Sequence, residues 1–574
     1  MKLKIIFVSL IALFLVFNNQ IVSAQSPSWI WAKSIGNIYN ELAHSVAVDD
    51  SGNVYSIGTF EGAVDFDPGM GVANILSQGI LDIYILKLDS SGNFKWAKSF
   101  GGTGTESGYA ITVDQSGNVF ATGRYANTID FDPGAGVFNL TSKGDKDIFV
   151  LSLSPAGNFL WAKSVGGTAE DDGFGIATDR LGFVYITGAF QNIVDFDPDG
   201  GTYNITSNGN WDAFVLRLET GGTFSWAVSF GGNLEDHGTS ITVDTSGNVY
   251  STGHFINTVD FDPGTGVSNI TSVGFTDIYI SKLDKNGNFI WVKTMGGVQG
   301  ENGNSIYVDQ SDNIYSTGEF LGTSDFDPGV GVYNMTAVGN SDPYISKLDN
   351  NGDFGWAKSM GANQADYGYS IVADPKGNIY TSGFFQGTVD FDPGTGIYNL
   401  TSAGSNDFFI SKLDTAGNFL WALKGGGPYS EQSKSIAIDN EGFLYITGSY
   451  MSSTVNFGTT TIINTVTMGA TADVYIAKLD SGFASIGMDD NITANNISVF
   501  PSPANQILII NFGKLSSEKN TIEIADISGK VIYINNSVSN NRVEVNTKYF
   551  TPGIYFVKII AGNLLETRKI VVLK

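Results

Sequence analysis

The chain repeats itself every 65 residues, and each repeat is marked by a tryptophan. The tryptophans that keep this spacing are Trp31, Trp96, Trp161, Trp226, Trp291, Trp356 and Trp421. Between them the unit reads roughly S-I-x-V-D, N-V-Y-x-T-G-x-F, V-D-F-D-P-G, D-I-Y-I-S-K-L-D and F-x-W-A-K. These segments alternate apolar and polar residues and are rich in β-branched and aromatic side chains, which predicts strands. A repeat this regular restricts the chain to architectures that stack one unit many times.

We expect four strands in each unit. In the first unit, Val48–Asn53 and Leu88–Asn93 read as tight turns, because each holds an Asp that can accept backbone N–H bonds and a Gly that supplies positive φ. The chain starts with a lone fourth strand, Trp29–Lys33, and ends with three strands, Ser435–Asp480, that lack a fourth. We therefore predict an all-β protein with a seven-bladed β-propeller over residues 29–480, closed by exchange of the N-terminal strand.

One segment of the unit resembles a known family. The recurrent S-G-N-V-Y-x-T-G core, at Ser51–Gly58, Ser116–Gly123 and Ser246–Gly253, resembles the SBBP-type β-propeller repeat of bacterial surface and secreted proteins. The resemblance covers nearly all of residues 29–480 and implies the propeller fold. Because that family has no single activity, it implies no particular chemistry.

The C-terminal segment differs from the repeats in charge. From Ile497 onward nine basic residues stand against five acidic ones, whereas the whole chain has 31 basic and 57 acidic residues. Val499–Ala504, Ile524–Val531, Pro552–Lys558 and Lys569–Lys574 resemble the type A sorting domain of the type IX secretion system, with Phe-Pro-Ser-Pro where Tyr-Pro-Asn-Pro is usual. The resemblance implies a small β-sandwich over residues 497–574, read by the secretion machinery of a Bacteroidetes-type bacterium and normally cleaved at the cell surface. Residues 481–496 are expected to be a linker.

The N-terminus predicts export. Lys2 and Lys4, the apolar run Ile5–Phe17 and the small residues before Gln25 fit a secretory signal peptide over residues 1–24. No later run is long and apolar enough to span a bilayer. We expect a monomeric propeller that is secreted or held at the outer cell surface. The lack of cysteine excludes disulfides and thiol chemistry, and a formal net charge of −26 argues against nucleic acid as a partner.

The D-F-D-P-G element carries a recurrent pair of carboxylates. In a strand both aspartates lie on one face and the Phe on the other, and Pro-Gly suits the centre of a type II turn. One interpretation is a hairpin whose Phe packs and whose aspartates accept backbone N–H bonds. The other interpretation is a calcium site, in which the two carboxylates supply part of a shell of six to eight oxygens. Calcium is the one cofactor that the sequence suggests. The candidate ligands are Asp65, Asp67, Asp130, Asp132, Asp260, Asp262, Asp325, Asp327, Asp390 and Asp392.

A further carboxylate lies ten residues after every repeat tryptophan, in the connection that leads into the innermost strand. These residues are Glu41, Glu106, Asp171, Asp236, Glu301, Asp366 and Glu431. Either each acid caps the backbone of the next blade, or together they form a ring that binds a cationic or amine-bearing ligand at the mouth of the central channel. This connection and the long loop with D-F-D-P-G share one face of the disc, so we expect that face to be the working one.

No catalytic residue is predicted. His44, His237 and His254 lie at different places in their units, and no Ser-His-Asp set or unique acid pair stands out. We therefore expect a non-enzymatic propeller that binds a protein or a glycan. Two alternatives stay open: a propeller hydrolase or lyase that uses channel-mouth carboxylates, and a purely structural surface component.

Overall fold

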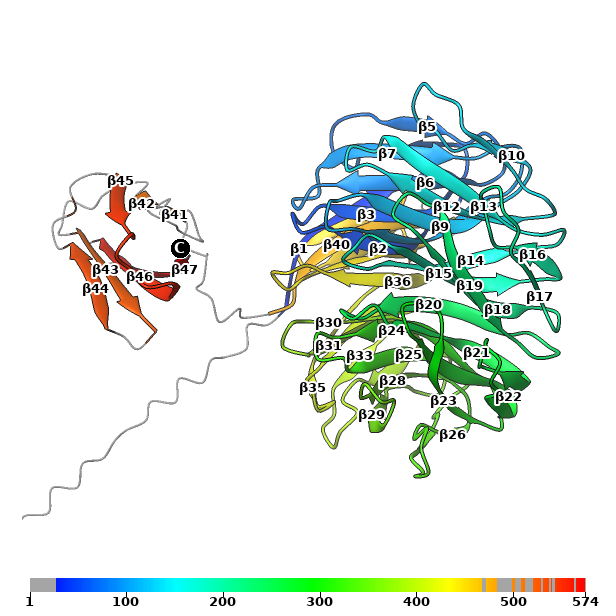
Figure 1. Cartoon of the computed structure of the whole chain (residues 1–574). Coiled ribbons are helices and arrows are strands. Elements are labelled where there is room, and N and C mark those ends of the chain that lie inside the picture. Colours follow the sequence, from blue (N-terminus) through cyan, green and yellow to red (C-terminus); the bar gives the residue numbers. More distant parts are fainter. Residues whose placement is uncertain are drawn as a thin grey trace, which may run out of the picture. The chain divides into compact units, whose positions relative to one another are not determined.

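The structure is a computed structural model, and it describes residues 27–466, 471–482, 498–500, 507–511, 520–527, 530–535, 538, 542–561 and 564–572. The predicted signal peptide and nearly all of the predicted linker lie outside these residues. The chain divides into two compact units, one of Ser26–Ser481 and one that includes Gly482–Lys574 (Figure 1). Throughout the described ranges every helix or strand element is a strand, so the predicted all-β class is confirmed.

The larger unit consists of antiparallel sheets of four long strands, one of which is extended by β26 and β27. Six sheets use four strands in chain order: β2 (Leu42–Val48), β3 (Val54–Phe60), β6 (Asp82–Leu88) and β7 (Phe94–Phe100); β8 (Ser107–Val113), β9 (Val119–Tyr125), β12 (Asp147–Leu153) and β13 (Phe159–Val165); β14 (Asp172–Thr178), β15 (Val184–Phe190), β18 (Asp212–Leu218) and β19 (Phe224–Phe230); β20 (His237–Val243), β21 (Val249–Asp260), β22 (Asn269–Leu283) and β23 (Phe289–Gly297); β24 (Glu301–Val308), β25 (Ile314–Phe320), β28 (Asp342–Leu348) and β29 (Phe354–Ser359); β30 (Tyr367–Ala373), β31 (Ile379–Phe385), β34 (Asp407–Leu413) and β35 (Phe419–Gly425).

The last sheet takes its fourth strand from the other end of the unit. It contains β36 (Glu431–Ile438), β37 (Phe443–Tyr450), β40 (Asp473–Asp480) and, beside β40, the first strand β1 (Ser28–Ile35). β1 runs antiparallel to β40, with Ala32 opposite Ala477. The unmatched end strands of the repeat thus pair with each other.

A short hairpin lies between the second and third long strands of most sheets. These hairpins are β4 (Ala63–Asp65) with β5 (Asn74–Leu76), β10 (Thr128–Asp130) with β11 (Asn139–Thr141), β16 (Ile193–Asp195) with β17 (Asn204–Thr206), β26 (Thr323–Asp325) with β27 (Asn334–Thr336), β32 (Thr388–Asp390) with β33 (Asn399–Thr401) and β38 (Thr454–Phe457) with β39 (Thr460–Ile463). In the fourth repeat the equivalent hairpin is continuous with β21 and β22.

The tight turns have the predicted chemistry. Gly52 and Gly92 have φ values of 73° and 77°, a conformation that favours glycine. The Oδ1 atom of Asp49 accepts the N–H groups of Ser51 and Asn53, both at 2.9 Å. The fifth repeat places Asp312 where the others have glycine, with φ 59°. Local hydrogen bonds therefore stabilise the tight turns that connect neighbouring strands.

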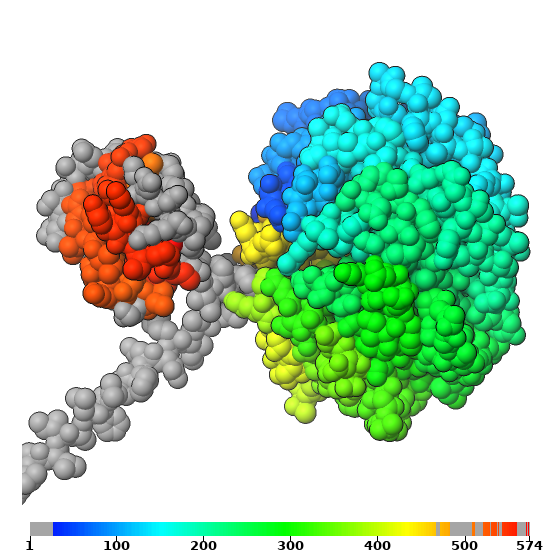
Figure 2. Space-filling model, in the orientation of Figure 1, coloured from blue at the N-terminus to red at the C-terminus, as the bar shows by residue number. Residues whose placement is uncertain are grey.

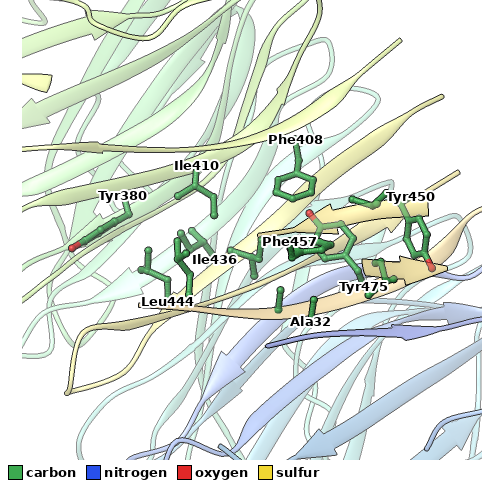
Figure 3. Packing of buried hydrophobic residues seen from close by; sticks show 14 of the residues in the cluster. Ala32, Tyr380, Phe408, Ile410, Ile436, Leu444, Tyr450, Phe457 and Tyr475 are labelled. Carbon is green, nitrogen blue, oxygen red and sulfur yellow. The ribbon is translucent and has the colours of Figure 1, made fainter. Parts of the chain in front are cut away.

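The core lies between neighbouring sheets. In the larger unit each hydrophobic cluster joins side chains of two successive sheets, and the cluster in Figure 3 joins Tyr380 and Ile410 to Leu444 and Tyr475. Another cluster joins Ile476 of the last sheet to residues of the first sheet. The first strands β2, β8, β14, β20, β24, β30 and β36 contact one another in this order, and β36 also contacts β2. Figure 2 shows the repeats following one another in sequence order over the surface of this unit.

The smaller unit contains two antiparallel sheets. Their strands are β41 (Ser498–Phe500), β42 (Ile507–Asn511) and β45 (Arg542–Asn546) in one sheet, and β44 (Val531–Asn535), β43 (Asn520–Asp526), β46 (Gly553–Ala561) and β47 (Leu564–Val572) in the other. Buried side chains from both sheets, including Leu508 and Val557, form a single cluster.

Candidate functional site

The D-F-D-P-G hairpins are held together by their own carboxylates. In each of the first six repeats the Oδ1 atom of the first Asp accepts backbone N–H groups two and eight residues later, as Asp260 does from Asp262 at 3.1 Å and from Ser268 at 2.7 Å. The Phe between the aspartates is buried, and Phe261 packs edge-on against Phe255. This is the hairpin interpretation. The candidate calcium ligands Asp65, Asp67, Asp130, Asp132, Asp325, Asp327, Asp390 and Asp392 make the corresponding bonds.

The turn in this element differs from the type II turn predicted from Pro-Gly. Gly264 is not among the glycines with positive φ, which a type II turn requires at this position. Instead, the N–H of Gly264 donates to Oδ1 of Asp262 at 2.8 Å. A Cβ on Gly266 would lie 2.1 Å from Oδ2 of Asp262. Glycine is therefore needed here because the carboxylate packs against the backbone, and the type II prediction is wrong.

Calcium has limited support from this geometry. Within the ranges that the structure describes, no three His, Asp or Glu side chains form a group that could hold a metal ion. The oxygens of the paired aspartates already accept hydrogen bonds from backbone amides, and these bonds stabilise the hairpins without a metal ion. Calcium at these hairpins stays a prediction.

The seven acids that follow the repeat tryptophans are buried. Their exposed fractions are 0–1%, and one carboxylate oxygen of each accepts the backbone N–H four residues earlier at 2.7–3.3 Å; the residues are Glu41, Glu106, Asp171, Asp236, Glu301, Asp366 and Glu431. The second oxygen of Asp236 accepts the N–H of Ile256 at 3.0 Å. This is the capping arrangement. Because these carboxylates are buried, the geometry favours the capping interpretation, and a channel-mouth ring that binds a ligand stays a prediction.

Burial also changes the acidity of these groups. Desolvation raises the pKa of Glu41 to about 8, of Glu106 and Glu301 to about 7, and of Asp236 to about 6. A carboxylate loses hydration when it is buried, and the hydrogen bonds from backbone amides offset only part of that loss.

A second set of buried carboxylates was not singled out from the sequence. It is the Asp that begins the third long strand of each repeat, or lies within it in the fourth repeat: Asp82, Asp147, Asp212, Asp277, Asp342, Asp407 and Asp473. Each lies against a glycine at the end of the fourth strand or just after it; a Cβ on Gly231, for example, would lie 2.0 Å from the carboxyl carbon of Asp212. Burial is the main cause of the raised pKa of Asp236, and the charge of Asp212 raises that pKa further. These aspartates recur at the repeat spacing, and that recurrence could have identified them from the sequence.

A cavity lies where the first strands of all seven sheets meet. Its volume is about 170 Å³, and it is lined by residues from β2, β8, β14, β20, β24, β30 and β36. One lining position, thirteen residues after the repeat tryptophan, differs in nearly every repeat. We call these residues the lining set: His44, Tyr109, Phe174, Thr239, Asn304, Tyr369 and Lys434.

The residue after each lining residue has a structural role instead. In five repeats it is a serine whose Oγ accepts an N–H from the first strand of the next repeat at 3.2–3.4 Å. One of these bonds runs from Val46 N–H to Ser435 Oγ and joins the first repeat to the last. The lining set thus varies on a scaffold that stays constant. The repeated motifs do not point to this set, although the sequence does show a variable position inside a regular strand.

Aromatic rings cover much of the cavity wall. The ring of Tyr109 lies 5.6 Å from His44 and 5.3 Å from Phe174, and Phe174 stacks on His237 at 6.0 Å. His237 stacks in turn on His254 at 4.9 Å. Burial lowers the pKa of both histidines, to about 3 for His254, so both rings are neutral at pH 7.

Charged groups beside the cavity are mostly paired. Arg124 contacts Glu170 at 2.6 Å and Asp172 at 3.3 Å. Glu319 accepts hydrogen bonds from the side chains of Asn302 at 2.8 Å and Asn304 at 2.5 Å, and burial raises its pKa to about 7.

A larger pocket of about 690 Å³ adjoins the cavity and shares His44 and Lys434 with it. Leu42 and Met451 contribute apolar walls and Gln432 a polar one. Two other pockets, of about 340 and 550 Å³, are lined by the tight turns of neighbouring sheets. At the lining set the repeats differ in side-chain chemistry on equivalent strands.

Comparisons with known proteins address the two units separately. Residues 498–573 match the secretion system C-terminal sorting domain family, and residues 160–189 match the beta-propeller repeat family. These matches confirm the two resemblances seen in the sequence. Within the described ranges, no helix has the length and hydropathy needed to cross a membrane.

The chain is also similar to two longer proteins. It is 24% identical over 512 residues to an uncharacterized WD repeat-containing protein of Acanthamoeba polyphaga mimivirus, and 26% identical over 212 residues to the regulatory protein FlaEY of Caulobacter vibrioides. The matches span 75% and 36% of this chain, but only 36% and 22% of those relatives. A solved protein of unknown function from Dyadobacter fermentans is 10% identical, with a TM-score of 0.36 and coverage of 79% of this chain and 99% of that one. That TM-score is too low to support a shared fold.

Proposed function

We propose that this chain, a β-propeller repeat protein with a C-terminal sorting domain of the type IX secretion system, is a non-enzymatic binding protein whose ligand is a protein or a glycan. The sorting domain marks a secreted protein, extracellular or at the cell surface, and implies contact with the secretion machinery. Export begins with the N-terminal signal peptide over residues 1–24. The propeller acts as a monomer.

The proposal includes a closed seven-bladed ring. Its support is the pairing of β1 with β40, which gives the last sheet its fourth strand. Two further contacts between the first and last sheets support closure: the bond from Val46 N–H to Ser435 Oγ and a shared hydrophobic cluster. A closed ring leaves no unpaired sheet edge between the first and last repeats, which favours a soluble exported protein.

The observation that carries the binding role is the lining set. Seven equivalent positions on one regular scaffold hold a histidine, three other aromatic residues, a threonine, an asparagine and a lysine. A purely structural ring has no need for this variety at its centre. Concave sites that combine aromatic walls with a few polar groups are typical of ligand binding.

The same site gives little support to a hydrolase or lyase. The acids after the tryptophans are buried caps, and Asp172 and Glu319, the carboxylates beside the cavity, are buried as well. Asp172 contacts Arg124, and Glu319 is bonded to two asparagine side chains. Both carboxylates are held by protein partners, so a binding role is the simpler use of this site.

The test is a combined glycan and protein array probed with the mature chain from Gln25 onward. We expect a ligand that is captured by the wild type and lost when Tyr109→Ala and Tyr369→Ala are combined. The matched control combines Tyr203→Ala with Tyr398→Ala, since these tyrosines are exposed on the outer hairpins, away from the cavity. Capture that survives the first double variant and is lost in the control would contradict the proposed site.

A further inference from the structure

Lys434 stands out within the lining set because its charge has no ionic partner. Its ammonium lies 3.7 Å from the centroid of the Tyr369 ring, and among the described residues no carboxylate lies within ion-pair distance of it. Burial lowers its pKa to about 8, and the charge of Glu319 acts in the opposite direction. The other cation beside the cavity, Arg124, is already paired with Glu170 and Asp172. An incoming anion would therefore find its partner at Lys434.

Lys434 also lies where two spaces meet. It lines both the central cavity of about 170 Å³ and the adjoining pocket of about 690 Å³. His44 lines both as well, and it donates from Nδ1 to the carbonyl of Gly108 at 2.8 Å. When neutral, its ring keeps Nε2 as an acceptor for a ligand hydroxyl. A ligand in the pocket can thus reach an ammonium and an imidazole acceptor together.

The remaining surroundings suit a saccharide. Sugars present apolar C–H faces, which pack on aromatic rings, and hydroxyl groups, which need planar polar partners. Tyr109 and Phe174 supply a continuous aromatic wall of the cavity, and Tyr369, which also lines it, supplies a further ring. Gln432, in the wall of the larger pocket, provides an amide. A fully apolar ligand would leave these polar groups without partners, which is costly.

We propose that the joined cavity and pocket bind the end of an acidic saccharide, with a sugar carboxylate paired to the Lys434 ammonium and a sugar face against Tyr109. This inference rests on the proposed binding function and narrows its ligand. A neutral saccharide would desolvate Lys434 further without giving it a counter-charge. A carboxylate would restore a charge pair inside a site of low polarity, where such pairs are strong when their geometry is satisfied.

The experiment measures binding of three probes to the mature chain by titration calorimetry: a hexuronic acid oligosaccharide, the neutral hexose oligosaccharide of the same linkage, and a short peptide with a free C-terminal carboxylate. We expect the acidic saccharide to bind at least about tenfold more tightly than the neutral one, the size of one charge-assisted hydrogen bond. Lys434→Met is expected to remove that difference while Tyr109→Ala weakens both saccharides.

The matched control is Lys347→Met, which removes a lysine that also lies over a tyrosine ring, 5.5 Å from the centroid of Tyr315, but beside the tight turns. This variant should bind the acidic saccharide as the wild type does. Thermal melting shows that each variant is folded. The inference is overturned if both saccharides bind equally, if Lys434→Met leaves the preference intact, or if only the peptide binds. A neutral ligand lost with Tyr109→Ala but kept with Lys434→Met would overturn the acidic saccharide and leave the proposed function standing.

Discussion

The indole Nε1 of Trp31 donates to the carbonyl of Ser90 at 3.1 Å, across the junction between the last sheet and the first. Trp31 lies on β1, whereas Ser90 lies in the turn between β6 and β7. The same bond recurs at 3.1–3.4 Å from Trp96 to Pro155, Trp161 to Thr220, Trp226 to Lys285, Trp291 to Asn350 and Trp356 to Thr415. The repeat tryptophan therefore connects neighbouring sheets, and Trp31 makes that connection for the N-terminal strand.

Replacing Trp31 is expected to destabilise the larger unit. Trp31→Ala removes a buried aromatic side chain and should lower the free energy of unfolding by about 3–5 kcal/mol. Trp31→Phe keeps most of the packing and loses the hydrogen bond, at a cost of about 1 kcal/mol. Urea unfolding followed by tryptophan fluorescence measures both. Equal midpoints for wild type and Trp31→Ala would contradict a structural role for this junction.

The buried caps can be tested with two adjacent acids. Asp236 accepts two backbone N–H groups and is 1% exposed, whereas its neighbour Glu235 is exposed and accepts a hydrogen bond from the side chain of Asn210. Asp236→Ala leaves two partly buried N–H groups without acceptors and should lower the free energy of unfolding by about 2–4 kcal/mol. Glu235→Ala should change the stability by less than about 0.5 kcal/mol. Similar losses for the two variants would argue against the capping role.

The pH dependence of stability follows from the same buried acids. Because burial raises the pKa of Glu41 to about 8 and of Glu106 to about 7, above the values of the unfolded chain, the folded chain binds more protons between about pH 4 and pH 8. Stability should therefore fall as the pH rises through that window. Asp89 acts oppositely, since hydrogen bonds and Lys95 lower its pKa to about 2, and its contribution is lost only at lower pH.

Melting at pH 5 and pH 8 measures this effect. We expect a higher midpoint at pH 5, and the difference should persist in 0.5 M salt, which screens long-range repulsion among surface carboxylates but not the cost of burial. A higher midpoint at pH 8 would contradict the raised pKa values of the buried acids.

The hairpin aspartates predict little response to metal removal. Because Asp260 and Asp262 bond to backbone amides, the hairpins should keep their structure without calcium. The melting midpoint of the mature chain should be the same in 1 mM calcium and in chelator. A midpoint that rises with calcium would instead support a metal site at these residues, because a ligand that binds only the folded state stabilises it.

Most of the fold was predictable because the repeat displays it many times. The strand patterns, the Asp and Gly of the tight turns and the pairing of the end strands all follow from local chemistry repeated at a fixed spacing. The turn type at Gly264 was not predictable in this way, because the carboxylate of Asp262 replaces the backbone bond that Pro-Gly suggests. Burial of Glu41 and its equivalents was equally hidden, since isolated carboxylates are usually exposed.

The candidate site was predictable only in part. Loop lengths favoured one face of the disc, and that choice stays a prediction. On that face the repeated acids were favoured over a position that varies. His237 and His254 lie at different places in the repeat, yet they stack because His237 pairs with His254 across β20 and β21. Such contacts depend on strand register, which the sequence pattern alone does not specify for single side chains.

A disulfide between β1 and β40 tests the central claim, that the end strands close the repeats into one ring around the lining set. The chain has no cysteine, so Ala32→Cys combined with Ala477→Cys places the only two thiols at positions that face each other across the strands. The control combines Ala32→Cys with Ala357→Cys, a buried alanine of β29. We predict that mild oxidation converts the first variant, but not the control, into an internally cross-linked monomer with raised mobility on non-reducing gels. Free thiols in both variants after oxidation of the folded protein would contradict ring closure by the N-terminal strand.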